Sequence, residues 1–191
     1  MPRRPRDESP DAIHHVVAKG NAGERLVRDD GDRRNLIGYL ERSITRFRWS
    51  CLAYCLLDTH IHLVVRTPTP NLGCGMQSFE APYAQAFNHR YERQGHLFRG
   101  RYYSTRLETA DHLVSAIIYV SLNPVRAGMV EQPELWRWSS YAATAGFVPA
   151  PSYLDVAATL ELIDTDTAAA RRRLVAGIRD ARDRDLLSFR P

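Results

Sequence analysis

The sequence predicts an α+β protein of the ferredoxin-like sandwich class, with helices on one face of an antiparallel sheet. Its 191 residues are 44% hydrophobic and 25% charged, values typical of a globular domain that buries a sizeable core. Four short segments have the composition of strands, and three longer ones have helical spacing of apolar residues. They follow one another as β, α, β, β, α, β, α, an order that suits this sandwich.

A strand and a helix come first. Residues 11–19, DAIHHVVAK, alternate well enough for a strand, and the glycines that follow indicate a loop. A helix is predicted between Asp30 and Arg46, with Asp29 or Asp30 as its cap. Its apolar positions recur at spacings of three and four residues: Leu36, Ile37, Leu40, Ile44 and Phe47.

Residues 49–66, WSCLAYCLLDTHIHLVVR, are too apolar and too rich in β-branched residues for a surface helix. Asp58 and Thr59 offer a turn in the middle of this segment. The sequence therefore predicts a hairpin of two buried strands.

The remaining elements are two helices and a short strand. A helix is predicted over roughly residues 75–93, with Pro82 expected to kink it or delay its start. Residues 99–108, RGRYYSTRLE, are expected to form an arginine-rich strand. The third helix, capped by Thr109 or Asp111, should end near Asn123, because Pro124 disfavours helical backbone at the residue before it.

Three regions are expected along the chain. Residues 1–10 form a basic arm, residues 11–150 form the main domain, and residues 151–191 form a helical extension. A short packed helix is expected in PELWRWSSYAATAG. The arginine- and aspartate-rich tail is either a solvated helix docked by Leu174, Ile178 and Leu186 or a mobile extension.

Charge and cysteine content narrow the function classes. The net charge is +4, and Lys19 is the only lysine among the 26 basic residues. Arginine binds phosphate in a fork, which suits nucleic acid, although GC-rich codon usage explains the bias equally well. The three cysteines show no zinc spacing.

No apolar run approaches the roughly 20 residues of a membrane span, and no signal peptide is evident, so we expect a cytoplasmic protein without a membrane partner.

His60 and His62 form the first candidate site. Alternate side chains of a strand share a face, so two imidazoles can bind one divalent ion while Ile61 points to the opposite layer. Burying two histidines in LLDTHIHLVV costs free energy unless their nitrogens find partners. A structural or surface explanation of so short a pattern stays open.

Tyr119 and Asn123, in IIYVSLNPVRAG, form the second. Four residues apart on a helix, they lie on one face, so a phenol and an amide oxygen can approach the same point. The amide can then serve as a third metal ligand. The alternative is a core tyrosine followed by a residue of the helix end.

The segment GHLFRGRYYSTR, residues 95–106, alternates arginines with aromatic residues. On a strand, Arg99, Arg101 and Tyr103 would share one face, and proteins that bind single strands combine phosphate contacts with aromatic stacking. The alternative is an edge strand protected by its charge.

These segments together resemble the REP-associated tyrosine transposases, a branch of the HUH single-strand transposases. The resemblance runs from about Ile13 to Tyr141 through HHVVAKGN, AYCLLDTHIHLVV, YAQAFNHRYERQGHLFRGRYYS, YVSLNPVRAG and WRWSSY. The combination of HLFRGRYYS with LNPVRAG is far more specific than the histidine pair or the tyrosine.

The resemblance implies roles for these residues. It implies a ferredoxin-like catalytic domain over residues 11–150 and a single-stranded DNA substrate with palindromic hairpins. Tyr119 would be the nucleophile, and the ligands of Mg²⁺ or Mn²⁺ would be His60, His62 and Asn123. A 5′-phosphotyrosine intermediate would let the enzyme cleave and rejoin DNA without a nucleotide cofactor. The residues predicted to bind DNA are Lys19, Asn21, Asn88, Arg90, Arg99, Arg101, Tyr102 and Arg126, of which Asn88, Arg90 and Arg126 extend the arginine-rich surface of residues 95–106.

Several points stay open from the sequence. Asp58 departs from the usual family pattern and is either a partner of a ligating histidine or a turn residue. The rival functions are a replication initiator or relaxase, a noncatalytic DNA-binding descendant of a transposase, and an unrelated His-x-His metal hydrolase. We expect a monomer.

Overall fold

The computed structural model describes residues 9–188, and the side chains of residues 186–188 lie outside that description. Its four strands form one antiparallel sheet in the order β2-β3-β1-β4. The strands are β1 (Ala12–Lys19), β2 (Ser50–Leu56), β3 (His60–Thr67) and β4 (Tyr103–Leu107). The two central strands are β3 and β1, and helices can cover both faces of the sheet at this position.

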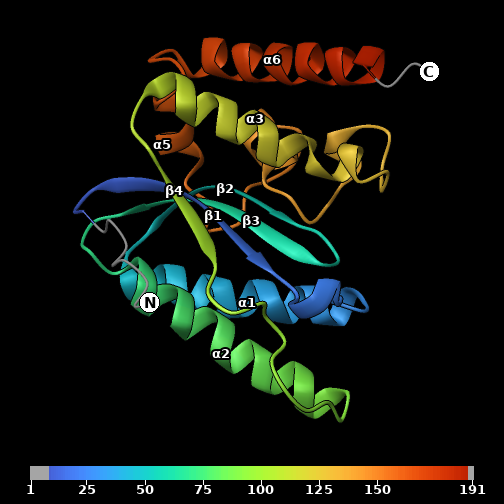
Figure 1. Ribbon diagram of the computed structural model, residues 1–191. Coiled ribbons are helices and arrows are strands. Elements are labelled where there is room, and N and C mark those ends of the chain that lie inside the picture. The colour runs from blue at the N-terminus through green and yellow to red at the C-terminus, as the bar shows by residue number, and fades with distance from the viewer. Residues whose placement is uncertain (1–8, 189–191) are drawn as a thin grey trace.

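Helices cover the two faces of this sheet (Figure 1). On one face lie α1 (Asp30–Phe47) and α2 (Leu72–Arg90), which complete the predicted ferredoxin-like order of strands and helices. On the other lie α3 (Ala110–Arg126), α5 (Val156–Glu161) and α6 (Thr167–Ser188). The predicted α+β sandwich is confirmed, but the expectation that the helices lie on one face is wrong, because α3 packs on the opposite face from α1 and α2. A space lies between the sheet and α3.

The α1 helix follows the sequence prediction. The Asp29 side chain accepts a hydrogen bond of 2.9 Å from the backbone N–H of Asp32, so Asp29 is the N-cap. The helix ends at Phe47, and its C-cap residue, Arg48, adopts a left-handed conformation. Leu36 and Leu40 are fully buried in the core beneath the sheet.

The predicted hairpin is also present, with its turn at residues 57–59. Along β3, Ile61, Leu63 and Val65 are fully buried in the core shared with α1 and α2. The alternate side chains, among them His60 and His62, face the α3 layer because the side-chain period of a strand is two residues.

Neither proline interrupts its helix, and α2 covers Leu72–Arg90 where residues 75–93 were predicted. The α2 helix begins at Leu72 and continues through Pro82, and α3 continues through Pro124 to Arg126 instead of ending near Asn123. A proline removes one backbone donor, but α2 packs on α1, and α3 packs on β2 and α6. Tertiary packing therefore overrides the local preference of these residues.

The arginine-rich strand is shorter than predicted. β4 covers Tyr103–Leu107 rather than residues 99–108, because Gly100 adopts a positive φ of 60° and its N–H donates to the carbonyl of Phe98. The predicted common face of Arg99, Arg101 and Tyr103 does not form. Residues 95–102 instead form a loop that runs past α2 into β4.

The C-terminal part of the chain builds the second layer. The expected packed helix is present as a short 3-10 turn, η2 (Pro133–Leu135), and α4 (Tyr141–Ala145). α6 docks on this layer through Leu174 and Ile178, as predicted, whereas the side chain of Leu186 lies outside the described residues. Of the basic arm at residues 1–10, only Ser9 and Pro10 are described.

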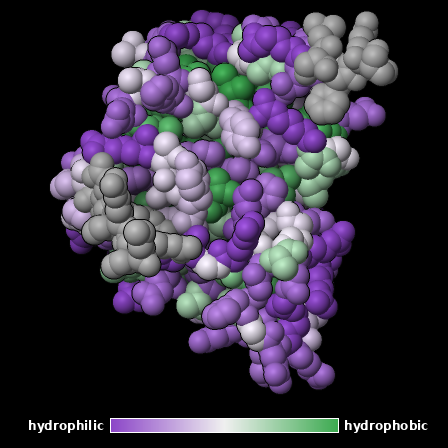
Figure 2. All heavy atoms as spheres, viewed as in Figure 1, coloured by the Kyte–Doolittle hydropathy of each residue, from purple (hydrophilic) through white to green (hydrophobic). Residues whose placement is uncertain are grey.

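Hydrophilic residues cover most of the visible surface in Figure 2, and apolar residues do not gather there into a large patch. Within residues 9–188, no helix combines the length and the apolar character that crossing a membrane requires.

The close approach of α2 to Trp49 gives a stability prediction. A Cβ added at Gly75 would lie 2.1 Å from the buried Trp49 ring. We expect Gly75→Ala to lower the free energy of unfolding by about 1–3 kcal/mol, measured by urea denaturation. Gly38→Ala is the control, because nothing lies within 4 Å of its added Cβ. Equal stability of the two variants would contradict the prediction.

Candidate active site

A hollow of about 450 Å³ lies between the sheet and α3. β1 and β3 pair so that Val17 lies opposite His62 and Lys19 lies opposite His60. These side chains share the sheet face that α3 covers, and Tyr119 of α3 completes the wall. The lining residues are His15, Val17, Lys19, His60, His62, Tyr103 and Tyr119.

The structure brings the two histidines and the tyrosine of the sequence analysis together. The ring centroids of His60 and His62 are 5.0 Å apart, and those of His62 and Tyr119 are 5.5 Å apart. Tyr119 is 43% exposed, whereas His62 is buried. The phenol is therefore accessible to a large substrate while the imidazole behind it is shielded from water.

His15 is a third histidine in the hollow that the sequence analysis did not single out. Its ring stacks on His62 with centroids 5.3 Å apart and lies 5.9 Å from the ring of Tyr119. The pair His14-His15 in β1 was the available signal, because alternation puts one of the two on each face of the sheet. His15 faces the hollow, and His14 is buried on the α1 and α2 side.

Hydrogen bonds fix which nitrogen of each histidine is available. The Nδ1 atom of His62 lies 3.0 Å from Nε2 of His15, and Nδ1 of His60 lies 3.0 Å from the hydroxyl of Thr59. The Nε2 atom of His62 is buried and makes no hydrogen bond within the described part of the chain. A buried nitrogen without a partner costs free energy, and a bound cation would remove that cost.

The electrostatics of the hollow keep the imidazoles neutral. The pKa of His62 is lowered to about 3, chiefly by burial and then by the nearby positive forms of His60 and His15 and by the charge of Lys19. Burial, followed by the charge of Lys19, lowers the pKa of His60, and burial lowers that of His15. Neutral imidazole is the form that ligates a metal.

Asn123 lies one turn beyond Tyr119 on α3 and is buried, and it is not among the residues that line the hollow. Its side-chain N–H donates a 2.8 Å hydrogen bond to the carbonyl of Tyr119, so Oδ1 is the atom with which it can ligate a metal. Within residues 9–188, no group of three or more histidine, cysteine or acidic residues is placed to hold a metal ion. The role of Asn123 as third ligand stays a prediction.

Arg126 lies beside the tyrosine. Its guanidinium is 5.1 Å from the centroid of the Tyr119 ring, and its Nε donates a 2.8 Å hydrogen bond to Asp185 of α6. Both charged side chains are more than a third exposed, so their ion pair contributes little to stability. A phosphate group that approaches Tyr119 can therefore compete for this arginine.

Of the other residues predicted to bind DNA, some are exposed cations and some contribute to the fold. Lys19 lines the hollow, and the exposed Arg99 and Arg101 have no ion-pair partner within residues 9–188. Tyr102 is buried, and the backbone N–H of Asn21 donates to the carbonyl of Leu97, which ties the loop after β1 to the 95–102 loop.

Asn88 and Arg90 have structural contacts. Asn88 donates a 2.9 Å hydrogen bond to the carbonyl of Gly95 and accepts one from Arg93. Arg90 pairs with Asp29 at 2.7 Å and Asp32 at 2.6 Å, which joins the end of α2 to the start of α1. Their predicted contacts with DNA stay predictions.

Asp58 is a turn residue rather than a partner of a histidine. Its carboxylate pairs with Arg33 and, at 3.6 Å, with Arg25, and its carbonyl accepts from Leu26 and Val27. The hydroxyl of Thr59, and not the carboxylate of Asp58, is hydrogen-bonded to Nδ1 of His60.

The fold and the hollow together define an α+β protein with a histidine pair and an accessible tyrosine on one side of its sheet. Among solved structures, the chain is similar to a REP-associated tyrosine transposase bound to a REP hairpin. The TM-score is 0.67 at 15% identity, over 81% of this chain and 94% of the other. This likeness shows that the chain has the fold of that transposase, as the sequence resemblance implies.

A second solved structure, from Deinococcus radiodurans R1 and described as a transposase, matches with a TM-score of 0.42 at 15% identity, over 66% of this chain and 92% of that one. No protein-family model matches the chain, and no curated protein matches its sequence at a significant level.

Proposed function

We propose that this chain is a REP-associated type of tyrosine transposase, which cleaves and rejoins single-stranded, hairpin-flanked DNA with the help of Mg²⁺ or Mn²⁺. The observation that carries the proposal is the hollow in which the ring centroids of Tyr119 and His62 are 5.5 Å apart, on a fold shared with a transposase of that kind. The enzyme would act as a monomer in the cytoplasm.

The charge around the hollow supports a DNA substrate. Lys19 lies inside it, Arg126 lies against Tyr119, and Arg99 and Arg101 are exposed on the loop that leads into β4. Cations so placed can contact successive phosphates of one strand. The similar solved transposase holds a REP hairpin, which supports hairpin DNA as the substrate of this chain.

The histidines fit a divalent cation. His60 and His62 would hold it through their Nε2 atoms, since both Nδ1 atoms have hydrogen-bonding partners and the buried Nε2 of His62 has none in the described residues. Asn123 would add its amide oxygen. When bound, the ion would neutralise charge on a phosphate oxygen and orient the phosphodiester. Imidazole ligands suit Mn²⁺ better than Mg²⁺.

Tyr119 and Arg126 would then carry out the exchange of one phosphodiester bond for another. The phenolic oxygen of Tyr119 attacks phosphorus, the bond from phosphorus to the 3′ oxygen breaks, and a 5′-phosphotyrosine forms. The phenolic proton leaves Tyr119, and the departing 3′ oxygen gains one to become a hydroxyl. Arg126 would hold the phosphate against the phenol, and the reverse reaction with another 3′ hydroxyl would rejoin the strand.

His15 would position His62 for metal binding. Its Nε2, 3.0 Å from Nδ1 of His62, fixes the tautomer that leaves Nε2 of His62 available. We expect His15→Ala to weaken Mn²⁺ binding about 10–100-fold, measured by electron paramagnetic resonance of free Mn²⁺. His15→Gln, which retains a hydrogen-bonding group, should restore part of that affinity at an unchanged melting temperature. Equal Mn²⁺ affinity of wild type and His15→Ala would contradict this role.

The direct test uses labelled single-stranded hairpins taken from the DNA that flanks the gene. The protein is incubated with them in Mn²⁺ or in EDTA, and the products are separated on denaturing gels. We expect a covalent protein–DNA adduct that depends on Mn²⁺. Tight binding without an adduct on any flanking hairpin would instead support a noncatalytic DNA-binding descendant of a transposase.

A further inference from the structure

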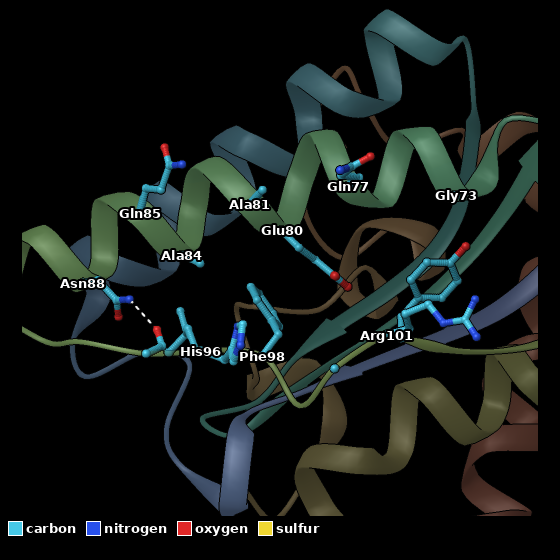
Figure 3. Close-up of a pocket in the computed structure, with 14 residues that line it drawn as sticks. Gly73, Gln77, Glu80, Ala81, Ala84, Gln85, Asn88, His96, Phe98 and Arg101 are labelled. Carbon is cyan, nitrogen blue, oxygen red and sulfur yellow. Dashed lines mark hydrogen bonds between the residues drawn. The ribbon is translucent and has the colours of Figure 1, made fainter. Parts of the chain in front are cut away.

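A groove runs along the outer helix α6, beside the short helix α4. It joins two hollows of about 280 Å³ and 340 Å³ that share Val175 and Arg179 in their walls. None of the described residues that line it lines the hollow beside Tyr119 or the cavity of about 630 Å³ between α2 and the 95–102 loop (Figure 3). We propose that this groove, called here the α6 groove, binds a segment of single-stranded DNA that flanks the cleavage site; the proposal rests on the proposed function.

The spacing of arginines along α6 places several of them in the groove. An α-helix returns to the same side every three to four residues, and the arginines on this side all line the groove: Arg171, Arg172, Arg179 and Arg182. Leu174 and Ile178, on the neighbouring side, are buried and hold α6 on the molecule. α6 lies beyond Tyr141, where the sequence resemblance to the transposases ends, so that resemblance implies no role for it.

The groove carries an excess of positive charge. Among the described residues in its walls, Glu134 is the one acid beside the four arginines, and the aspartates of α6 line neither hollow. Arg172 and Arg179 are exposed and form no ion pair with the side chains that the structure describes. The Nε atom of Arg171 is buried and makes no hydrogen bond to those side chains or to their backbone. The phosphates of an anionic strand would supply partners for these groups.

An exposed aromatic ring favours a single strand over a duplex. Phe147 lines the groove, is 54% exposed, and meets the buried ring of Tyr141 edge-on with centroids 6.1 Å apart. Proteins that bind single strands combine such rings, on which bases stack, with cations that contact the phosphates. A duplex keeps its bases paired with each other, so it could use only the arginines.

The groove begins one helical turn from a contact beside the proposed nucleophile. Arg126 lies 5.1 Å from the centroid of the Tyr119 ring and donates a hydrogen bond to Asp185 of α6. Arg182 precedes Asp185 by about one turn of this helix, and from Arg182 back to Arg171 the groove extends about 16 Å along the helix axis. A strand that leaves Tyr119 past Arg126 can therefore continue into the groove, and arginines at its two ends can contact different phosphates.

The test measures the fluorescence anisotropy of a labelled oligothymidylate of about 20 nucleotides, in EDTA, over a series of salt concentrations. The double variant Arg172→Gln, Arg179→Gln should bind about 10-fold more weakly at low salt. Its slope of log affinity against log salt concentration should be smaller by about 1.4, because each phosphate contact to a single strand contributes about 0.7. The double variant Arg173→Gln, Arg184→Gln is the control, since it removes the same charge from exposed positions of α6 outside the groove, and it should keep the wild-type slope.

Phe147→Ala tests the stacking contact independently of charge. It should weaken binding of the same oligothymidylate about 10-fold and leave the salt slope unchanged, because it removes no cation. Leu135→Ala is its control, at an apolar position that is 63% exposed and lines neither hollow, and it should bind like the wild type.

The outcomes separate the groove from the proposed function. Equal affinity and slope in the wild type and the Arg172, Arg179 variant would overturn the groove, and so would an equal decrease in the control variant, because net charge would then explain the effect. A decrease confined to a DNA duplex of the same length would overturn the choice of a single strand. The assay contains no metal and requires no cleavage, so a missing covalent adduct on flanking hairpins, with the oligothymidylate effects present, would overturn the proposed function alone.

Discussion

Replacing Tyr119 with phenylalanine is expected to abolish the covalent protein–DNA adduct. The substitution removes the only atom of this side chain that can attack phosphorus, and it retains the ring that packs against His15, His62 and Arg126. Loss of a nucleophile lowers the rate by orders of magnitude, so we expect a decrease of at least about 1,000-fold. Denaturing gels of reactions with Mn²⁺ and a labelled hairpin measure it.

Tyr103→Phe is the matched control, because it removes a phenolic oxygen from the same hollow. Tyr103 is 66% exposed, so the substitution should have little effect on stability. We expect Tyr103→Phe to form the adduct. An undiminished adduct in Tyr119→Phe would exclude Tyr119 as the nucleophile, and loss in the Tyr103 variant alone would assign that role to Tyr103.

The second large effect is expected for His62→Ala. This change removes the buried Nε2 atom that has no hydrogen-bonding partner in the described residues, and it removes the imidazole on which His15 stacks. We expect Mn²⁺ affinity to fall at least about 100-fold and adduct formation to fall with it. Calorimetric titration with Mn²⁺ and the gel assay together measure both.

His112→Ala serves as the control for His62→Ala, since His112 is an exposed histidine in the first turn of α3 and does not line the hollow. It should bind Mn²⁺ like the wild type. If His62→Ala retained Mn²⁺ affinity while its cleavage was lost, the metal would have to bind elsewhere.

The order of the elements and the buried face of each followed from local sequence patterns. Leu36 and Leu40 in α1, and Ile61 and Leu63 in β3, are fully buried as their periodicity predicts. Pro82 does not delay the start of α2, and the end of α3 expected near Asn123 was wrong, because a proline's local effect is small beside the packing of a whole helix. Local patterns carry no information about contacts between distant segments.

The same limit applies to the candidate site. Strand alternation put His60 and His62 on one face of a strand, and helical spacing put Tyr119 and Asn123 on one face of a helix. Only the tertiary fold brings that strand and α3 together. His15 was missed because its meaning depends on β1 pairing with β3. The path of residues 99–102 was also missed, because they form a loop where a strand was expected.

β3 gives one set of side chains to the core and the alternate set to the hollow. Ile61, Leu63 and Val65 are fully buried on one side, and His60 and His62 lie on the other. An insertion or deletion of one residue within this strand would exchange the two sets, burying imidazoles among aliphatic side chains. The gene segment for β3 should therefore tolerate no change of length, whereas loops at the surface can vary in length.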